Sequence, residues 1–199
     1  MTFLRLPFPP ELPPPLHGQK VMLRVPVAAD HEAWSSLRQQ SRSFLTPWEP
    51  VWPDNDLLRP AFRSRIKHYW REIESDSSYP YFIFASGKPD LLGAITISNV
   101  RRGVAQMGTL GYWIGAPHAR QGYMSEALQL MKHLAFGHLG LHRLEAACLP
   151  TNAPSMALLK RAGFTQEGYA KAYLKIAGVW QDHQLFSCIS PQADLPSGP

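Results

Sequence analysis

The stretch from Gly108 to Leu128 contains residues suited to binding an anion. An apolar segment leads into a short loop rich in glycine and proline, and a helix is expected to open at about Gly122. The first N–H groups of a helix have no partner inside it, and a glycine lets a ligand approach them closely. Arg120 stands beside this point as a charge partner for phosphate. The pattern indicates a phosphate cradle, although an ordinary strand–helix junction has the same spacing.

Two well-known phosphate motifs do not account for this junction. No Gly-Lys-Ser/Thr follows the loop, which excludes a P-loop, and the spacing G-x-G-x-x-G is absent, which excludes a dinucleotide fingerprint.

A second group of polar residues follows the next apolar segment. Glu145 lies on an expected strand, Asn152 comes just after it, and Ser155 falls in the first turn of an expected helix. A carboxylate on such a strand is either a general base or a solvated residue. Asn152 either positions a ligand or caps the helix that follows. Ser155 is either a reactive-site hydroxyl or an ordinary first-turn serine.

Hydrophobic periodicity places these residues on a mixed set of elements. Two helices follow the first strand, three strands linked by hairpins come next, and the period then changes to that of a helix. The expected strands are 21–25, 81–85, 92–99, 105–114, 142–149, 164–173 and 182–189, and the expected helices are 31–40, 61–74, 125–139 and 154–162. Hairpins early in the chain and crossovers later predict an α+β fold. Its central sheet is mostly antiparallel with one parallel strand pair, flanked by about four helices.

Composition limits the class of protein. The 199 residues carry a net charge of +5, which favours an anionic ligand or a partner near RNA without requiring either. No apolar run approaches the ~20 residues that span a bilayer, and the proline-rich start lacks the core of a secretion signal. Two cysteines cannot form a disulfide framework, so a cytoplasmic setting is expected. The predicted organisation is an extended arm at 1–19, one domain at 20–190 and a flexible tail at 191–199.

Both polar regions resemble the GNAT superfamily of acetyl-CoA-dependent N-acetyltransferases. The family's cradle motif is Arg/Gln-x-x-Gly-x-Gly/Ala, and Ala119, Gly122 and Met124 stand at its three defined positions. The central glycine is present, whereas the first and last positions depart from the common choice. The segment HRLEAACLPTNAPSMALLKRAGFTQEG, residues 142–168, is similar to the second family motif of strand, Asn-x-x-Ser, helix and Gly-Phe.

The ending of the chain, residues 167–187, is similar to the RimJ/RimL branch and is closest to its RimJ side, through residues that include Trp180, Asp182 and His183. That branch acetylates the N-terminal α-amines of ribosomal proteins. The resemblance implies direct transfer from acetyl-CoA to a protein N-terminus that starts with Ala or Ser. It also implies contact with the ribosome, a cytoplasmic location, and no membrane or metal.

Amide formation from a thioester needs a neutral amine, and Glu145, on the strand before Asn152, is the candidate base. Ser155, one turn into the next helix, is a second candidate catalytic residue, expected to face the thioester sulfur. Backbone N–H groups of the strand that ends at Ile114 are expected to polarise the acetyl carbonyl. The residues expected to bind coenzyme A are Ile114, Arg120, Gln121, Gly122, Tyr123, Met124, Ser125, Asn152 and Ser155.

One family position argues for sparse acid–base chemistry. Many GNAT enzymes have a tyrosine as general acid where this chain has Leu159, and leucine cannot donate a proton. An α-amine has a pKa of ~7.7–8, against ~10.4 for lysine, so an appreciable fraction of it is already neutral at neutral pH. Two alternatives stay open: a GNAT enzyme that acetylates a small amine such as a polyamine or antibiotic, and a non-catalytic ribosome- or RNA-associated protein with this fold.

Other candidate residues have simpler explanations. His133, His138 and His142 invite a metal, but no carboxylate or cysteine completes a tetrahedral set, so no metal site is expected. Cys148 lies on an expected buried strand and is interpreted as an inert core thiol. The proline-rich loop that carries Trp48 and Trp52 either lines a substrate channel or closes over the core.

Overall fold

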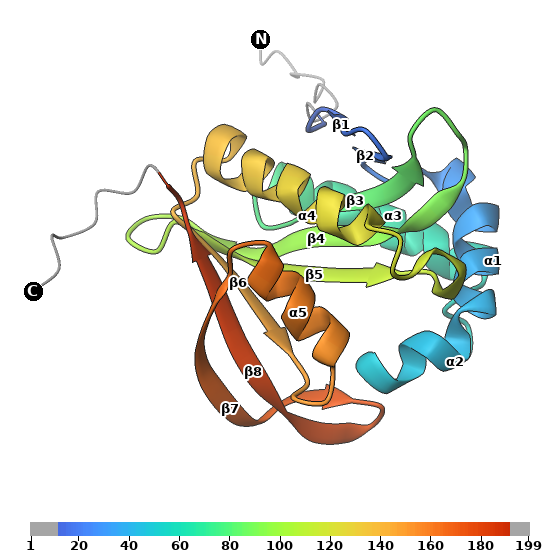
Figure 1. The fold of residues 1–199 in the computed structure, drawn as a ribbon. Coiled ribbons are helices and arrows are strands. Elements are labelled where there is room, and N and C mark those ends of the chain that lie inside the picture. The colour runs from blue at the N-terminus through green and yellow to red at the C-terminus, as the bar shows by residue number, and fades with distance from the viewer. Residues whose placement is uncertain (1–11, 192–199) are drawn as a thin grey trace, which may run out of the picture.

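The computed structural model describes residues 12–191 as an eight-stranded sheet with helices on both faces (Figure 1). The strands lie in the order β1-β2-β3-β4-β5-β6-β8-β7. Every neighbouring pair is antiparallel except β5 and β6, which are parallel. This arrangement confirms the predicted mixed sheet with one parallel pair.

The strands are β1 (Leu16–His17), β2 (Val21–Arg24), β3 (Tyr79–Ala85), β4 (Leu91–Arg101), β5 (Met107–Ile114), β6 (Arg143–Cys148), β7 (Thr165–Ile176) and β8 (Val179–Ile189). The α-helices of the described residues are α1 (His31–Gln40), α2 (Arg42–Leu45), α3 (Arg59–Glu74), α4 (Tyr123–His133) and α5 (Ala153–Arg161). The expected set of about four helices corresponds to α1, α3, α4 and α5, and α2 is a single additional turn.

Two hydrophobic cores cover the two faces of the sheet. On one face, α4 and α5 pack against residues such as Tyr81, Ile95 and Leu144. On the other face, α1 and α3 pack against Phe82 and Phe84. Strand β3 supplies alternate side chains to both cores, which explains why its sequence YPYFIFA is an unbroken apolar run.

The structure differs from the sequence prediction at the start of the sheet, at the start of α4 and in the bounds of several strands, among them β7 and β8, which extend to Ile176 and from Val179. The sheet begins at Leu16, before the expected domain start at residue 20, because β1 pairs with β2 and the Tyr81 hydroxyl donates to the Pro14 carbonyl at 3.1 Å. Helix α4 starts at Tyr123, two residues before the predicted Ser125, and a π-helical turn at Leu134–His138 extends it through Gly137. Residues 1–11 of the expected arm and 192–199 of the expected tail lie outside the described part.

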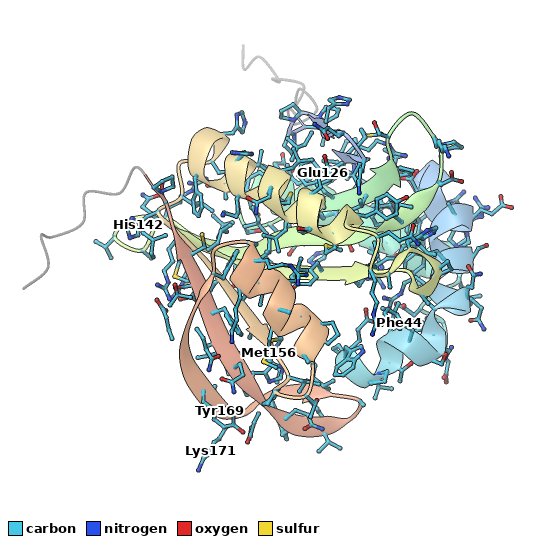
Figure 2. The ribbon with its side chains drawn as sticks, viewed as in Figure 1. Phe44, Glu126, His142, Met156, Tyr169 and Lys171 are labelled. Atoms are coloured by element: carbon cyan, nitrogen blue, oxygen red, sulfur yellow. The ribbon has the colours of Figure 1, made fainter. Side chains whose placement is uncertain are left out.

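Strands β7 and β8 form a long hairpin that curves away from the rest of the sheet (Figure 1). It turns at Ala177–Gly178, as predicted, and both residues have positive φ values, 48° and 83°. The register shifts between Ala170 and Leu174, where Ala172 also has a positive φ of 45°. Figure 2 shows Tyr169 and Lys171 projecting from this hairpin to the outside.

The close approach of β4 to β5 generates a stability prediction. A Cβ atom at Gly93 would lie 2.3 Å from the Trp113 carbonyl oxygen, so Gly93→Ala must move backbone. We expect this change to lower the free energy of unfolding by about 1–3 kcal/mol, the usual cost of overpacking. Gly137→Ala is the control, because nothing lies within 4 Å of its Cβ position. Equal unfolding midpoints of the two variants in a denaturant titration would contradict the prediction.

Candidate functional site

The site is built around the point where β5 and β6 separate. In the parallel pairing only three residue pairs are matched, and the last pair is Thr109 with Glu145. Strand β5 nevertheless continues to Ile114 and β6 to Cys148. Beyond that point the two strands have unpaired edges that face one another. Such edges carry backbone donors and acceptors that a ligand is able to satisfy.

Two N–H groups of β5 point into this gap. The Gly115 N–H donates to the Leu92 carbonyl at 2.8 Å, which directs that residue's N–H toward β4. Because N–H directions alternate along a strand, those of Tyr112 and Ile114 face the opposite edge, toward β6. They belong to the strand segment from which carbonyl polarisation is expected.

A cavity of about 720 Å³ fills the gap. We call it the main cavity. It reaches both faces of the sheet, because Cys148 packs with the core under α4 and α5, whereas the neighbouring Ala147 points the opposite way. Its lining includes Phe44, Trp48, Glu49, Gly111, Tyr112, Ile114, Arg120, Gln121, Gly122, Tyr123, Met124, Ser125, Ala147, Cys148, Asn152, Ser155, Leu158, Arg161, Leu174, Ile176 and His183. The predicted coenzyme A residues thus lie around one cavity.

The predicted cradle lies at the start of α4. Gly122 is its N-cap with φ +85°, and Arg120 has φ +62°, so the backbone turns sharply just before the helix opens. No side chain caps this helix, which leaves its first N–H groups available to an anion. The Gln121 amide donates to the Pro117 carbonyl at 2.8 Å and holds the loop. Met124 packs its side chain in the core, so it offers only backbone to a ligand.

Lys20 is a residue of this region that the sequence analysis missed. Its Nζ lies 3.5 Å from the Gln121 carbonyl oxygen and 3.5 Å from the position of a Cβ at Gly122. The Glu126 carboxylate, labelled in Figure 2, accepts the backbone N–H groups of Gln19 at 2.6 Å and Lys20 at 2.9 Å. These bonds fix the β1–β2 turn against α4. No local pattern signals this proximity, because about a hundred residues separate the two segments.

Ser155 lies with Tyr112 and Cys148 on the α5 side of the gap. The Ser155 hydroxyl is 2.9 Å from that of Tyr112, and the Asn152 side chain accepts the Ser155 N–H at 3.1 Å as the N-cap of α5. Burial raises the pKa of Tyr112 to about 12 and also raises the pKa of the Cys148 thiol. All three side chains are therefore neutral at physiological pH, and Cys148 is buried as expected.

The opposite side of the gap carries the loop with both tryptophans. Arg38 holds the Glu49 carboxylate through two hydrogen bonds of 2.7 Å, and the Trp52 indole N–H donates to the same carboxylate at 2.7 Å. The Arg38 guanidinium also stacks 3.9 Å from the centre of the Trp52 ring. The Ala177 N–H donates to the Glu49 carbonyl at 2.9 Å, which ties the loop to the β7–β8 turn. Trp48 lines the main cavity.

A second cavity of about 420 Å³ lies on the face of the sheet that α1 and α3 cover. Trp34, Trp52, Trp113 and Phe82 line it, and we call it the aromatic cavity. It shares Glu49 and the β5 residues Gly111, Tyr112 and Trp113 with the main cavity. Both cavities therefore reach the same three residues of β5.

Glu145 does not join the other predicted catalytic residue. Its carboxylate accepts from Arg143 Nε at 2.9 Å, and Arg143 also pairs with Glu167, whose pKa it lowers. Glu145 lines neither cavity. The structure therefore places Glu145 in an ion pair with Arg143, and its role as base stays a prediction. Alternation along β6 indicated its face of the sheet but not its distance from the gap.

Residues 12–191 contain no group of three or more His, Cys, Asp and Glu placed to hold a metal ion. His133, His138 and His142 are not brought into such a group. Within the same residues, no helix has the length and apolar character needed to cross a membrane.

Comparison with known proteins decides the family. Residues 20–165 match the family described as Acetyltransferase (GNAT) domain. The chain belongs to the GNAT acetyltransferases. It is 34% identical to YjcK of Bacillus subtilis, named as a probable N-acetyltransferase, over 88% of this chain and 97% of that protein. It is 33% identical to the [ribosomal protein uS5]-alanine N-acetyltransferase of Escherichia coli, over 85% of this chain and 88% of that protein.

A solved structure supports the same assignment. The RimJ protein of Mycobacterium smegmatis, in complex with a coenzyme A disulfide, superposes with a TM-score of 0.84 at 30% identity, over 92% of this chain and 88% of that one. As a GNAT acetyltransferase of the RimJ/RimL type, the protein uses acetyl-CoA as cosubstrate. The main cavity fits this role, because an uncapped helix start with a left-handed glycine lies at one end and unpaired strand edges lie further in.

The cradle yields a prediction about coenzyme A binding. Gly122→Glu places a carboxylate at the uncapped start of α4, where it repels phosphate, whereas Gly122→Ala introduces only the strain of a positive φ. We expect Gly122→Glu to weaken coenzyme A binding well beyond Gly122→Ala in isothermal titration calorimetry. Unchanged affinity in the glutamate variant would show that the pyrophosphate lies elsewhere.

Proposed function

We propose that coenzyme A enters the gap from the α4–α5 side of the sheet. Its pyrophosphate lies on the α4 cradle, and its thioester lies beside the unpaired edge of β5. The residues that hold it are Ile114, Arg120, Gln121, Gly122, Tyr123, Met124, Ser125, Asn152 and Ser155. Their common position around one cavity supports this assignment, and Lys20 adds a cation beside the cradle.

We infer that the acceptor is the N-terminal α-amine of a protein, of the ribosomal type, beginning with Ala or Ser. The observation that carries this proposal is that the main cavity passes between β5 and β6 and is lined on the far side by α2, the Trp48 loop and the β7–β8 hairpin. A chain end is able to approach the thioester from that side while coenzyme A occupies the other. The name of the Escherichia coli relative supports a ribosomal acceptor beginning with alanine, and such an acceptor would place the reaction in the cytoplasm.

The charges around the two cavities favour an α-amine over a small polycation. Glu49 is already neutralised by Arg38, and Asp56, which lines the aromatic cavity, is paired with Arg65. A polyamine site requires carboxylates that are free to bind several ammonium groups. The two acids of these cavities are not free.

Ser155 is the group on the thiol side that we assign to protonating the leaving sulfur. Leu159 is fully buried in the core and supplies no proton. The Ser155 hydroxyl lines the cavity and is backed by the Tyr112 hydroxyl, which replaces the proton that Ser155 gives up. A thiol has a pKa of roughly 8.5, so the thiolate is a fair leaving group and needs only modest assistance.

Acceptor choice is the direct test of this function. Peptides that begin with Ala or Ser should be acetylated, whereas a peptide with a blocked N-terminus and an internal lysine should not. A lysine amine presents ~100-fold less free base at the same pH because its pKa is higher by two or more units. Mass spectrometry of both reactions gives the answer, and comparable modification of the internal lysine would overturn the α-amine assignment.

Ser155→Ala tests the thiol side of the site. We expect turnover to fall by an amount near the lower end of the ~10²–10⁴-fold range for acid–base groups, since thiolate leaves readily. Tyr112→Phe keeps the ring and removes only the partner hydroxyl, so its loss should be smaller. Steady-state kinetics separate the cases: an unchanged kcat with a higher KM for acetyl-CoA in Ser155→Ala would assign Ser155 to binding alone.

A further inference from the structure

His183 occupies the acceptor side of the gap. In the pairing of β8 with β6, Gln184 lies opposite Cys148 and therefore shares the face of the sheet covered by α5. Side chains alternate along a strand, so His183 points to the other face, as Ala147 does. The residue is 3% exposed and lines the main cavity. It thus faces the gap from the side opposite Ser155.

One hydrogen bond fixes the protonation pattern of the His183 ring. Nδ1 lies 3.0 Å from the Gln181 carbonyl oxygen, and a carbonyl only accepts, so Nδ1 carries the hydrogen. In the neutral ring the lone pair is then on Nε2. The Tyr173 ring meets the imidazole edge-on at 5.7 Å and restrains it further.

The Nε2 atom has no hydrogen-bond partner among the described residues. Within residues 12–191, four fully buried side-chain nitrogens have no hydrogen-bond partner. They are His31 Nδ1, Arg38 Nε, Arg65 Nε and Trp70 Nε1, and the Nε2 atom of His183 is not one of them. Because the Nε2 atom has no hydrogen-bond partner and is not fully buried, part of it is accessible to solvent. His183 lines the main cavity, so we take this accessible part of Nε2 to face the main cavity.

We propose that His183 is the general base that removes a proton from the acceptor amine, with Nε2 as the accepting atom. The assignment rests on the proposed function, because it requires an amine to approach from the β7–β8 side. It provides the base that Glu145, in its ion pair with Arg143, does not provide at the gap.

The proton balance of the reaction is complete with these groups. Nε2 takes one proton from the acceptor ammonium, and the freed nitrogen lone pair bonds to the acetyl carbon. The carbon–sulfur bond breaks, its electron pair stays on sulfur, and the sulfur takes a proton from Ser155. The second proton that the nitrogen loses when the amide forms replaces the proton drawn from the Ser155–Tyr112 pair. The imidazolium returns its proton to solvent.

Charged neighbours of His183 do not compete for this role. Asp182 accepts the Tyr169 hydroxyl at 2.5 Å and the Ala172 N–H at 2.8 Å, and its carboxylate also interacts electrostatically with His183. Glu49 is held by Arg38, and burial raises the pKa of Cys148, so it remains a neutral thiol. The other titratable groups around the ring and the cavity are Tyr112, His118, Arg120, Tyr123, Arg161 and Tyr173. Of the carboxylates, only Glu49 lines the main cavity within residues 12–191.

The experiment compares His183→Gln with the wild-type chain on a peptide that begins with alanine. At neutral pH we expect kcat to fall by about 10-fold, because only about a tenth of an α-amine with a pKa of ~8 is already neutral there. The affinity for coenzyme A in calorimetry should not change. The deficit should shrink as the pH rises above ~8, where the α-amine is already neutral.

A second acceptor separates a base from a structural residue. A peptide capped with an aminooxyacetyl group presents a nucleophilic nitrogen that is neutral at pH 7, so His183→Gln should acetylate it at close to the wild-type rate. A deficit of equal size on both acceptors, or at every pH, would overturn the role as base. His138→Gln is the matched control at an exposed histidine and should keep full activity.

Two further outcomes are distinguishable. If Glu145→Gln shows the pH-dependent loss and His183→Gln does not, the base is Glu145 and the present inference is wrong. If the wild-type chain acetylates no N-terminal peptide, the proposed function itself fails and this assignment fails with it.

Discussion

The separation of β5 from β6 is the constraint on which the rest of the structure depends. A parallel pair inside an otherwise antiparallel sheet requires a long crossover, and α4 supplies it. The same crossover brings the start of α4, with its unpaired N–H groups, to the end of β5 where the gap opens. The anion cradle therefore lies at the start of this crossover, next to the strand gap, and the gap exists because β6 pairs with β5 at only three positions.

The groups on both sides of the gap between β5 and β6 leave little net charge near the thioester. On the α5 side, Ser155, Tyr112 and Cys148 are neutral. On the other side, Glu49 is locked to Arg38. A developing charge at the thioester therefore meets few opposing charges and several dipoles, since β5 presents N–H groups and α5 a hydroxyl. Such a site suits a reaction between a neutral amine and an uncharged thioester. The base proposed on the opposite side of the gap, His183, then has only to remove one proton from the amine.

Local signals in the sequence predicted the α4 junction, the Asn152 cap and the hairpin turn at Ala177–Gly178 well, because glycine, proline and capping residues act within a few positions. The order of hairpins and crossovers predicted the mixed sheet. Lys20 and Glu49 were missed because they reach the site through contacts between distant segments, and His183 was noticed only as a mark of its branch. The ion pairs of Arg143 with Glu145 and Glu167 were not foreseen either, because alternation gives the face of a strand, whereas the place of Glu145 at the end of the β5–β6 pairing depends on the whole sheet. The one-turn helix α2 was not predicted, because no capping side chain marks its start.

The contact between Glu126 and the β1–β2 turn has a consequence for the electrostatics of the cradle. Glu126 lies in the first turn of α4, next to the proposed cradle, and its negative charge would oppose an anion there. The backbone N–H groups of Gln19 and Lys20 occupy both of its oxygens, so the edge of the sheet screens this charge. A shortened chain that starts at residue 20 would retain the whole family-matched segment, yet it would lose the Gln19 donor and β1. Strand β1 and its turn thus reduce the repulsion between the Glu126 carboxylate and the phosphates of coenzyme A.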